Sequence, residues 1–294
     1  MDIAQANGID ICYDTIGDSA NPALLLVMGF TAQLTAWDDA FCQMLADGGR
    51  YVIRFDNRDS GLSTHFDGAR VDLPAVLEAW ESGKAMPPIP YSMSDFANDA
   101  FGLLDHLGIE RAHIVGASMG GMIVQTMAIE HPERVLTMTS IMSTTGEPEY
   151  YKWAPETRAA ISTPPPTDRA GFIETSVTLG QLLGSPRHFD PSAAATRAGS
   201  SYDRMFYPQG AARQTAAIRG SGDRATGLRA LRVPTLVMHG QSDTLILPLG
   251  GHRTAELVAG ANLLLLKDMG HDLPKPLWPL ITDAILSHTR HAVG

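Results

Sequence analysis

Short, almost wholly apolar runs recur along this chain, and stretches with helical spacing separate several of them. The clearest of these runs cover residues 23–28, 51–55, 112–115, 135–142, 235–238 and 263–266. Runs without alternating polar residues are typical of strands that are buried on both faces of a sheet. Because parallel strands need long crossover connections, the alternation predicts an α/β fold with a mostly parallel central sheet and flanking helices.

Local patterns add helices and one antiparallel edge to this prediction. Apolar side chains in 96–107 share one helical face, and the helix is expected to end at Gly108. Residues 37–45 and 122–127 have the same spacing. The dipeptide Asn7-Gly8 is a strong signal for a tight hairpin, so the N-terminal residues are expected to form an antiparallel edge.

Two parts of the chain interrupt the alternation. Residues 67–91 form an insertion that contains proline and tryptophan, and residues 143–227 show no clean succession of strand and helix. A structureless loop as long as 143–227 is uncommon in a compact domain, so an inserted helical cap over the end of the sheet is expected. The predicted organisation is a core domain of residues 1–142 and 228–294, with a helical cap, or lid, at 143–227.

Composition narrows the class of protein. The chain has 294 residues, of which 44% are hydrophobic and 18% charged, and this mixture supports a sizeable core. Its formal net charge of −10 disfavours nucleic acid and anionic membranes as partners. Two cysteines exclude a disulfide framework, and no metal-ligand spacing is present. Since we find no signal-peptide pattern or membrane-spanning run, we expect a cytoplasmic protein that uses no metal or other cofactor.

The sharpest motif is Gly116-Ala117-Ser118-Met119-Gly120, which lies between the run 112–115 and a stretch with helical spacing. A serine at such a strand-to-helix turn takes a strained backbone conformation, which lifts its hydroxyl clear of the sheet. Gly116 and Gly120 leave room for the strand and the helix to approach each other. The motif predicts that Ser118 is a nucleophile, against the alternative of a glycine-rich turn with a bystander serine.

A serine nucleophile needs a base, and the base needs an acid that orients it. Asp243 follows the run 235–238 and His271 follows the run 263–266, so both are expected at the carboxyl edge of the sheet. Their order after Ser118 is the one expected for this arrangement. Ser118, Asp243 and His271 are therefore the predicted catalytic triad, with His252 as an alternative base and Glu147 as an alternative acid.

Acyl transfer also needs hydrogen-bond donors for the oxyanion that develops in the transition state. The backbone N–H of Met119, directly after the nucleophile, is one expected donor. The second should come from the loop after 23–28, where Gly29 allows a tight turn, and we assign it to the N–H of Phe30. The polar segment 56–63 follows another strand, and its interleaved Arg58 favours a structural support over a catalytic acid–base pair.

Taken in order, these residues give the chain a resemblance to the α/β-hydrolase superfamily over nearly its whole length. Within it, the chain is similar to the aclacinomycin methylesterase-like carboxylesterases, through residues 24–29, 45–49 and 287–290. The resemblance implies hydrolysis of a carboxylic ester through an acyl-serine, including a methyl ester on a bulky ring system, with 143–227 as the cap. Met28 stands where many members have histidine, which changes the polar support of that loop.

The leading hypothesis is a cofactor-independent serine carboxylesterase that acts on a small-molecule ester with apolar or aromatic bulk. A lactonase, thioesterase or carbon–carbon bond hydrolase would use the same triad. A ligand sensor built on the same fold would be acylated at most once per chain, so turnover distinguishes it from an enzyme. The sequence does not indicate the oligomeric state.

Overall fold

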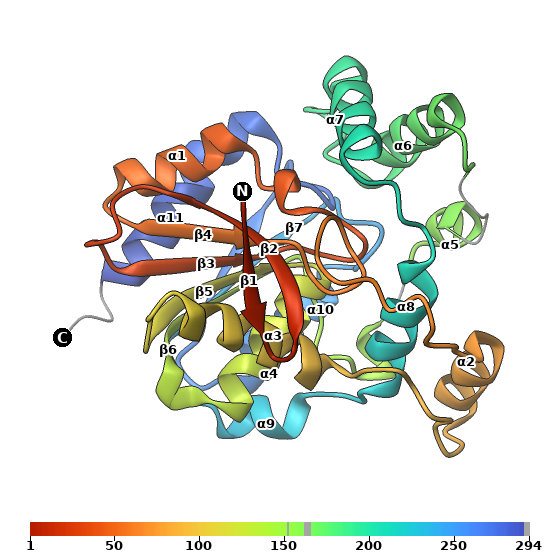
Figure 1. Cartoon of the computed structure of the whole chain (residues 1–294), viewed down its shortest axis with the longest axis horizontal. Helices are drawn as coiled ribbons and strands as arrows, with labels where there is room; N and C mark the ends of the chain where they lie inside the picture. Colours follow the sequence, from red (N-terminus) through yellow and green to blue (C-terminus); the bar gives the residue numbers. More distant parts are fainter. Residues whose placement is uncertain (152, 162–165, 291–294) are drawn as a thin grey trace.

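The computed structural model describes residues 1–151, 153–161 and 166–290. Its centre is an eight-stranded sheet with the strand order β1-β2-β4-β3-β5-β6-β7-β8 (Figure 1). Strands β1 and β2 and strands β2 and β4 pair antiparallel, and every later pair is parallel. The predicted mostly parallel sheet is thereby confirmed. The strands are β1 (Asp2–Ala6), β2 (Ile9–Ile16), β3 (Ala23–Val27), β4 (Tyr51–Phe55), β5 (Ala112–Ala117), β6 (Val135–Ile141), β7 (Thr235–Gly240) and β8 (Asn262–Leu266).

The antiparallel edge forms where the dipeptide Asn7-Gly8 predicted it. Asn7 and Gly8 have φ values of 50° and 77°, and they connect Ala6 to its partner Ile9. Two consecutive residues with positive φ are what a two-residue hairpin turn of matching twist requires, and asparagine and glycine adopt this conformation most readily.

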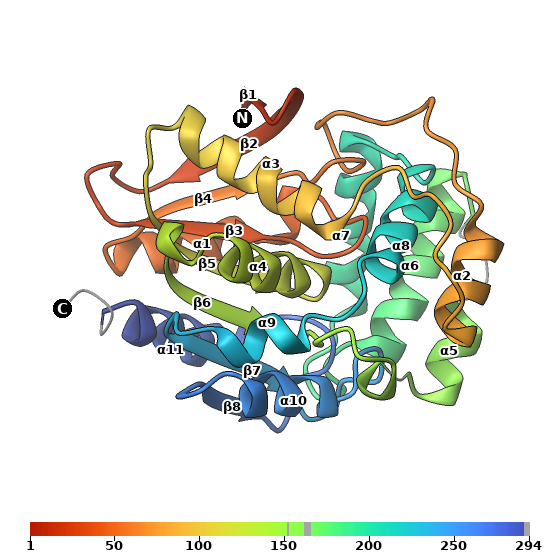
Figure 2. The ribbon, with the colours of Figure 1, turned by 90° about the horizontal axis from the view of Figure 1, so that it is seen from below.

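Helices cover both faces of the sheet because successive strand residues point to opposite sides. Leu24 and Leu26 join one apolar cluster with α1 (Asp39–Asp47) and α11 (Trp278–Arg290), whereas Leu25 joins another. The cluster around Leu25 includes side chains of five helices: α3 (Met93–His106), α4 (Met119–Glu130), α8 (Gly210–Gly220), α9 (Ala225–Ala230) and α10 (Leu249–Leu257). Helices α3, α4 and α9 lie in front of the sheet in Figure 2.

One expected helix begins later than the spacing of its apolar residues suggested. The pattern started at Trp37, but α1 begins at Asp39, because the Asp38 side chain accepts a hydrogen bond from the Ala40 N–H and caps the helix there. Trp37 instead follows a short 3₁₀ turn (Leu34–Ala36). Its ring still stacks on the Phe41 ring, with the two ring centroids 5.8 Å apart, so the apolar contact forms although Trp37 is not helical.

The two irregular stretches of sequence both contain helices. Helix α2 (Leu73–Ser82) lies between β4 and α3, and the described residues between β6 and α9 form four further helices: α5 (Pro155–Ile161), α6 (Arg169–Leu183), α7 (Pro191–Arg204) and α8 (Gly210–Gly220). Figures 1 and 2 show all five at one end of the sheet, beyond the carboxyl end of β6. Helix α9 spans the junction at residues 227 and 228 that the sequence suggested as a domain boundary.

Aromatic residues between 143 and 227 pack largely on one another. Phe172, Tyr202 and Phe206 form one cluster, with ring centroids 4.6–5.6 Å apart. The guanidinium of Arg219 lies 4.0 Å from the Trp80 ring centroid and 3.8 Å from that of Tyr151, which joins α8 to α2. Half-buried aromatic contacts therefore join α6 to α7, and cation–π contacts join α8 to α2.

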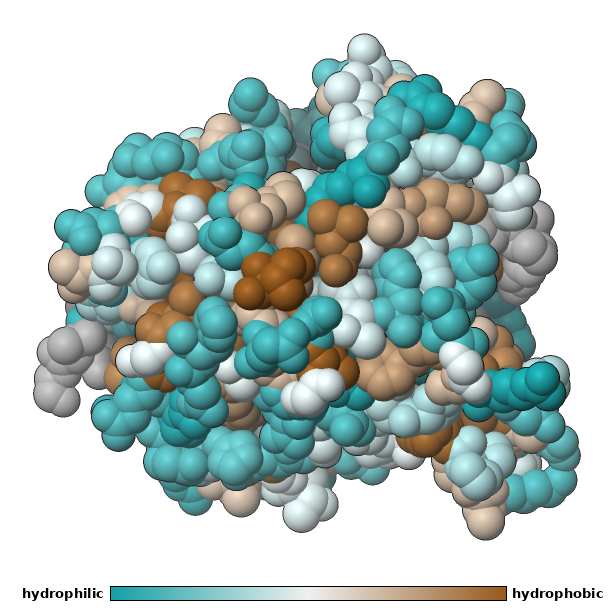
Figure 3. Space-filling view, in the orientation of Figure 1, coloured by the Kyte–Doolittle hydropathy of each residue, from teal (hydrophilic) through white to brown (hydrophobic). Residues whose placement is uncertain are grey.

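On the face seen in Figure 3, hydrophilic residues predominate and hydrophobic ones form small separate patches. No helix in residues 1–151, 153–161 or 166–290 combines the length and the apolar character that crossing a bilayer requires.

Candidate active site

Ser118 occupies the turn between β5 and α4 in a conformation that few residues adopt, with φ 58° and ψ −119°. The turn is fixed by the Ser118 N–H, which donates to the Ile141 carbonyl oxygen at 2.9 Å. A Cβ added to Gly116 would lie 2.0 Å from the Gly120 carbonyl oxygen, and one added to Gly120 would lie 2.1 Å from that of Val27. Glycine at both positions is what lets strand and helix approach closely enough to hold the turn.

His271 lies in the loop after β8, and its ring connects the other two predicted triad residues. Its Nε2 is 3.0 Å from Ser118 Oγ, and its Nδ1 is 2.7 Å from Asp243 Oδ2. The side chain of His271 is 10% exposed and that of Asp243 is fully buried. The His271 N–H donates to the Leu183 carbonyl oxygen at 2.7 Å, so the end of α6 helps to position this loop. The structure thus brings Ser118, His271 and Asp243 into one hydrogen-bonded chain.

Asp243 follows β7, and the backbone of its own loop fixes the carboxylate. Its Oδ1 accepts hydrogen bonds from the N–H groups of Leu245 and Ile246, both at 2.9 Å. Burial by itself would raise the pKa of Asp243, but the His271 imidazole and the nearby ring of His239 lower this pKa to about 2. Asp243 is therefore a carboxylate at neutral pH and accepts the proton of His271 Nδ1. This leaves Nε2 free to accept the proton of the Ser118 hydroxyl.

Glu147, the alternative acid, and His252, the alternative base, are not part of this hydrogen-bonded chain. Both carboxylate oxygens of Glu147 accept hydrogen bonds from Arg253 at 2.9 Å. His252 is an exposed residue of α10. Asp272, next to the histidine, accepts a hydrogen bond from the Ser185 hydroxyl rather than from His271.

The predicted oxyanion donors lie close to Ser118. A Cβ added to Gly29 would lie 3.1 Å from Ser118 Cβ, which shows how closely the loop after β3 approaches the nucleophile. Within the described part of the chain, the N–H groups of Phe30 and Met119 donate to no other backbone group. Asn57 donates to the Met28 carbonyl oxygen at 2.9 Å and so supports the loop after β3. The loop after β3 therefore comes close to the nucleophile, and the assignment of the Phe30 and Met119 N–H groups as oxyanion donors stays a prediction.

Two aspartates of the polar segment 56–63 form ion pairs with arginines of α7 and α8. Asp56 accepts a hydrogen bond from Arg204 of α7 at 2.8 Å, and Asp59 accepts two from Arg213 of α8 at 2.7 and 2.8 Å. Burial would raise the pKa of Asp59, but Arg213, together with other hydrogen bonds, holds this pKa below its usual range. The segment joins α7 and α8 to the sheet.

Several residues that support the site were not identified from the sequence. Ser185, just after α6, accepts from the Gly270 N–H at 3.0 Å and donates to Asp272, so it supports the loop that carries His271. Gln214 of α8 accepts from the Thr31 N–H at 2.8 Å. Both belong to the stretch without a clear pattern, and no local motif relates them to partners 85 to 183 residues away.

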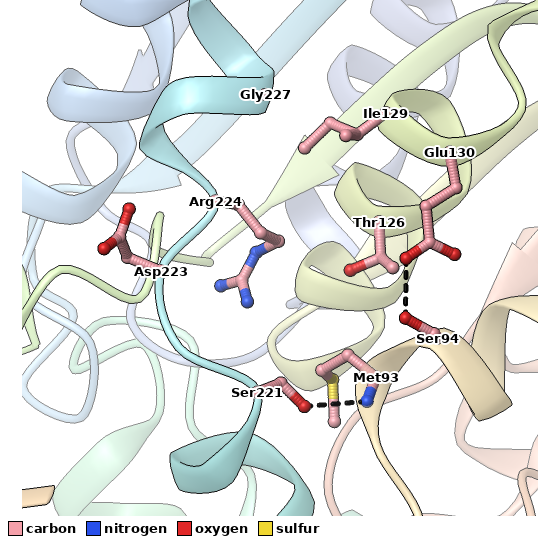
Figure 4. Close-up of a pocket in the computed structure, with 9 residues that line it drawn as sticks. All are labelled: Met93, Ser94, Thr126, Ile129, Glu130, Ser221, Asp223, Arg224 and Gly227. Atoms are coloured by element: carbon pink, nitrogen blue, oxygen red, sulfur yellow. Dashed lines mark hydrogen bonds between the residues drawn. The ribbon is translucent and has the colours of Figure 1, made fainter. Parts of the chain in front are cut away.

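A hollow of about 200 Å³ lies away from the triad, between α3, α4 and the segment 221–227 (Figure 4). Figure 4 shows Arg224 directed into it, and the Arg224 guanidinium also donates to Gln125 and to the Thr144 carbonyl oxygen. None of Ser118, Asp243 and His271 is among the residues that line it. It is a separate feature of the helix packing.

Comparison with known proteins agrees with this arrangement. The model of the alpha/beta hydrolase fold family matches residues 22–274. Rhodomycin D methylesterase DauP from Streptomyces sp. (strain C5) is 26% identical over 97% of this chain and 96% of its own length. Rhodomycin D methylesterase DnrP from Streptomyces peucetius is 27% identical with the same coverage.

Solved structures show the same architecture. The enol-lactonase from Burkholderia xenovorans LB400 superposes with a TM-score of 0.75 at 21% identity, over 98% of this chain and 100% of the other. A thermophilic esterase from Thermogutta terrifontis gives a TM-score of 0.73 at 21% identity, over 100% and 99%. With the family match covering most of its length, this chain belongs to the α/β-hydrolase fold family.

Proposed function

We propose that this protein is a serine carboxylesterase, with Ser118 as nucleophile, His271 as base and Asp243 as the acid that orients the base. The observation that carries the proposal is the hydrogen-bonded chain from Ser118 Oγ through His271 to Asp243, at the strained turn between β5 and α4. Its near-full-length similarity to two methylesterases supports ester hydrolysis as the reaction.

In the first half of the reaction, Ser118 Oγ attacks the ester carbonyl carbon while His271 Nε2 takes the hydroxyl proton. The carbonyl oxygen becomes an oxyanion, which the N–H groups of Phe30 and Met119 stabilise. The imidazolium of His271, stabilised by the Asp243 carboxylate, then protonates the leaving alkoxide, and the alcohol departs. In the second half, His271 activates a water molecule, which attacks the acyl-serine and releases the carboxylic acid.

The substrate is a small carboxylic ester with apolar or aromatic bulk, and a methyl ester is the specific candidate. The printed names of the two Streptomyces relatives, rhodomycin D methylesterases, support the methyl ester. We assign residues 143–227 as a cap over the site, which would shape the pocket for the acyl part. The position of α5–α8 and the contact of His271 with Leu183 support this assignment. A cytoplasmic location, as expected in the sequence analysis, belongs to the same proposal.

A panel of substrates tests this function. We expect many turnovers per chain on p-nitrophenyl acetate and on methyl phenylacetate, at a higher kcat/KM than on a δ-lactone or on an acyl thioester. A higher kcat/KM on the lactone or thioester would reassign the reaction within the same triad chemistry. Release of only one equivalent of p-nitrophenol per chain would contradict an esterase and favour a ligand sensor.

A further inference from the structure

The turn that carries Phe30 is held in a conformation that its own residues disfavour. The Ala32 N–H donates to the Gly29 carbonyl oxygen at 3.3 Å, which closes a four-residue turn over 29–32. Thr31, the third residue of this turn, has φ 55°. A β-branched residue is rarely found in the left-handed region, so the turn needs support from outside.

Gln214 of α8 supplies this support. Its Oε1 accepts from the Thr31 N–H at 2.8 Å, and its Nε2 donates to the Arg58 carbonyl oxygen and to Ser60 Oγ, both at 2.9 Å. Gln214 is fully buried. The carboxamide uses its carbonyl oxygen and both of its N–H groups, and so connects the turn after β3 to the loop after β4.

Other contacts fix α8 in place near Gln214. The ion pair between Arg213 and Asp59 binds the helix to the loop after β4. Gly210 packs so closely that an added Cβ would lie 2.3 Å from the Asp59 carbonyl oxygen. Because the helix has these separate anchors, removing the Gln214 amide would act on the turn at Thr31 rather than on the position of α8.

We propose that Gln214 is a positioning residue of the oxyanion hole. The Gly29 carbonyl and the Phe30 N–H belong to one peptide plane, so the turn that Gln214 holds at Thr31 fixes the direction of this N–H where the loop approaches Ser118. The inference rests on the proposed function, since it requires the Phe30 N–H to stabilise an oxyanion. It also makes the oxyanion hole depend on α8, which belongs to the inserted segment 143–227.

The variant Gln214→Met has a side chain of similar length and removes all three hydrogen bonds. We expect kcat for p-nitrophenyl acetate to fall about 10- to 100-fold, less than the loss of a whole oxyanion donor, with KM changed by less than about threefold. Inhibition by phenylboronic acid, which forms a tetrahedral adduct with a serine Oγ, should weaken by the same factor as kcat. Thr215→Val is the matched control, because the Thr215 hydroxyl donates within α8 itself, to the Ala211 carbonyl oxygen.

Gln214→Glu separates positioning from a folding defect, because burial favours its protonated carboxyl group, which keeps an acceptor for the Thr31 N–H and one O–H donor for the Arg58 carbonyl oxygen or Ser60 Oγ. It should recover part of the kcat that Gln214→Met loses. The positioning role would be overturned if Gln214→Met kept the kcat and the boronate inhibition of the wild type. It would also be overturned if the kcat of Gln214→Glu were no higher than that of Gln214→Met. Neither result would affect the turnover of the wild type. A wild type that hydrolyses no ester would overturn the proposed function, and the positioning role with it.

Discussion

Asp243 is held through both of its carboxylate oxygens, and this decides what its replacement would do. Oδ1 accepts from the N–H groups of Leu245 and Ile246, which leaves Oδ2 for His271. An asparagine in this place must keep its oxygen on the two N–H groups. Its amide nitrogen would then face His271 Nδ1 as a donor, and the ring would take the tautomer with its proton on Nε2.

The variant Asp243→Asn should therefore lose kcat while it keeps its fold. We expect a decrease of about 10⁴-fold in kcat, because Nε2 can no longer accept the Ser118 proton. Steady-state hydrolysis of p-nitrophenyl acetate measures this, and Asp105→Asn is the control, because Asp105 is an exposed carboxylate that pairs with Arg134. A kcat within tenfold of wild type would remove Asp243 from the triad.

His113 makes the stability of the folded chain depend on pH. Its ring is fully buried in β5, and burial lowers its pKa from the usual 6.5 to about 4. Between these two values the unfolded chain binds a proton that the folded chain does not, so the free energy of unfolding falls as pH decreases from 6.5 to 4. We expect His113 to account for a loss of about 2 kcal/mol between pH 7.5 and 5.

Urea denaturation at pH 7.5 and pH 5 measures this loss, with His113→Gln as the comparison. The variant removes the titrating group, so its own loss between the two pH values should be smaller than that of the wild type by about 2 kcal/mol. Equal losses in the two proteins would show that His113 does not titrate as its burial requires.

At the scale of elements, the crossing of β5 and α4 depends on two glycines. Gly120 places its Cα against β3, where an added Cβ would lie 2.1 Å from the Val27 carbonyl oxygen. We expect Gly120→Ala to lower the free energy of unfolding by about 3 kcal/mol or more, because backbone must move to admit the methyl group. Gly68→Ala is the control, since an added Cβ there has no atom within 4 Å. Urea denaturation of both variants measures the difference, and equal stability would contradict the close approach.

The elements that the sequence predicted are those whose apolar pattern is continuous and local. All six apolar runs became strands, with ends shifted by at most two residues, because a strand buried on both faces tolerates few polar side chains. The loops with Asp243 and His271 could be placed because parallel strands end at one edge. The contribution of Gln214 could not be predicted, because its partner Thr31 lies 183 residues earlier and α8 has no distinctive pattern. Nor did the sequence show that the loop of His271 rests on Leu183.

At the scale of the whole molecule, buried ion pairs join the inserted helices to the sheet. Arg213 and Asp59 are both largely withdrawn from solvent, with side chains 7% and 0% exposed. We expect Arg213→Met to lower the free energy of unfolding by about 3–5 kcal/mol, because it leaves the Asp59 carboxylate buried without its partner. The double variant Arg213→Met/Asp59→Asn should recover part of this loss. Calorimetric or urea unfolding measures the stability of both variants. A single variant as stable as the wild type would contradict the claim that this ion pair holds α8 to the sheet.

The central claim is that Ser118 is the nucleophile of an ester hydrolase, and the initial rate of p-nitrophenyl acetate hydrolysis tests it most directly. The comparison is between the wild type, Ser118→Ala and Ser94→Ala, a serine beside the separate hollow of Figure 4. We predict repeated turnover by the wild type and by Ser94→Ala, and a loss of at least about 10³-fold in Ser118→Ala. A Ser118→Ala rate within tenfold of wild type would show that another group performs the reaction.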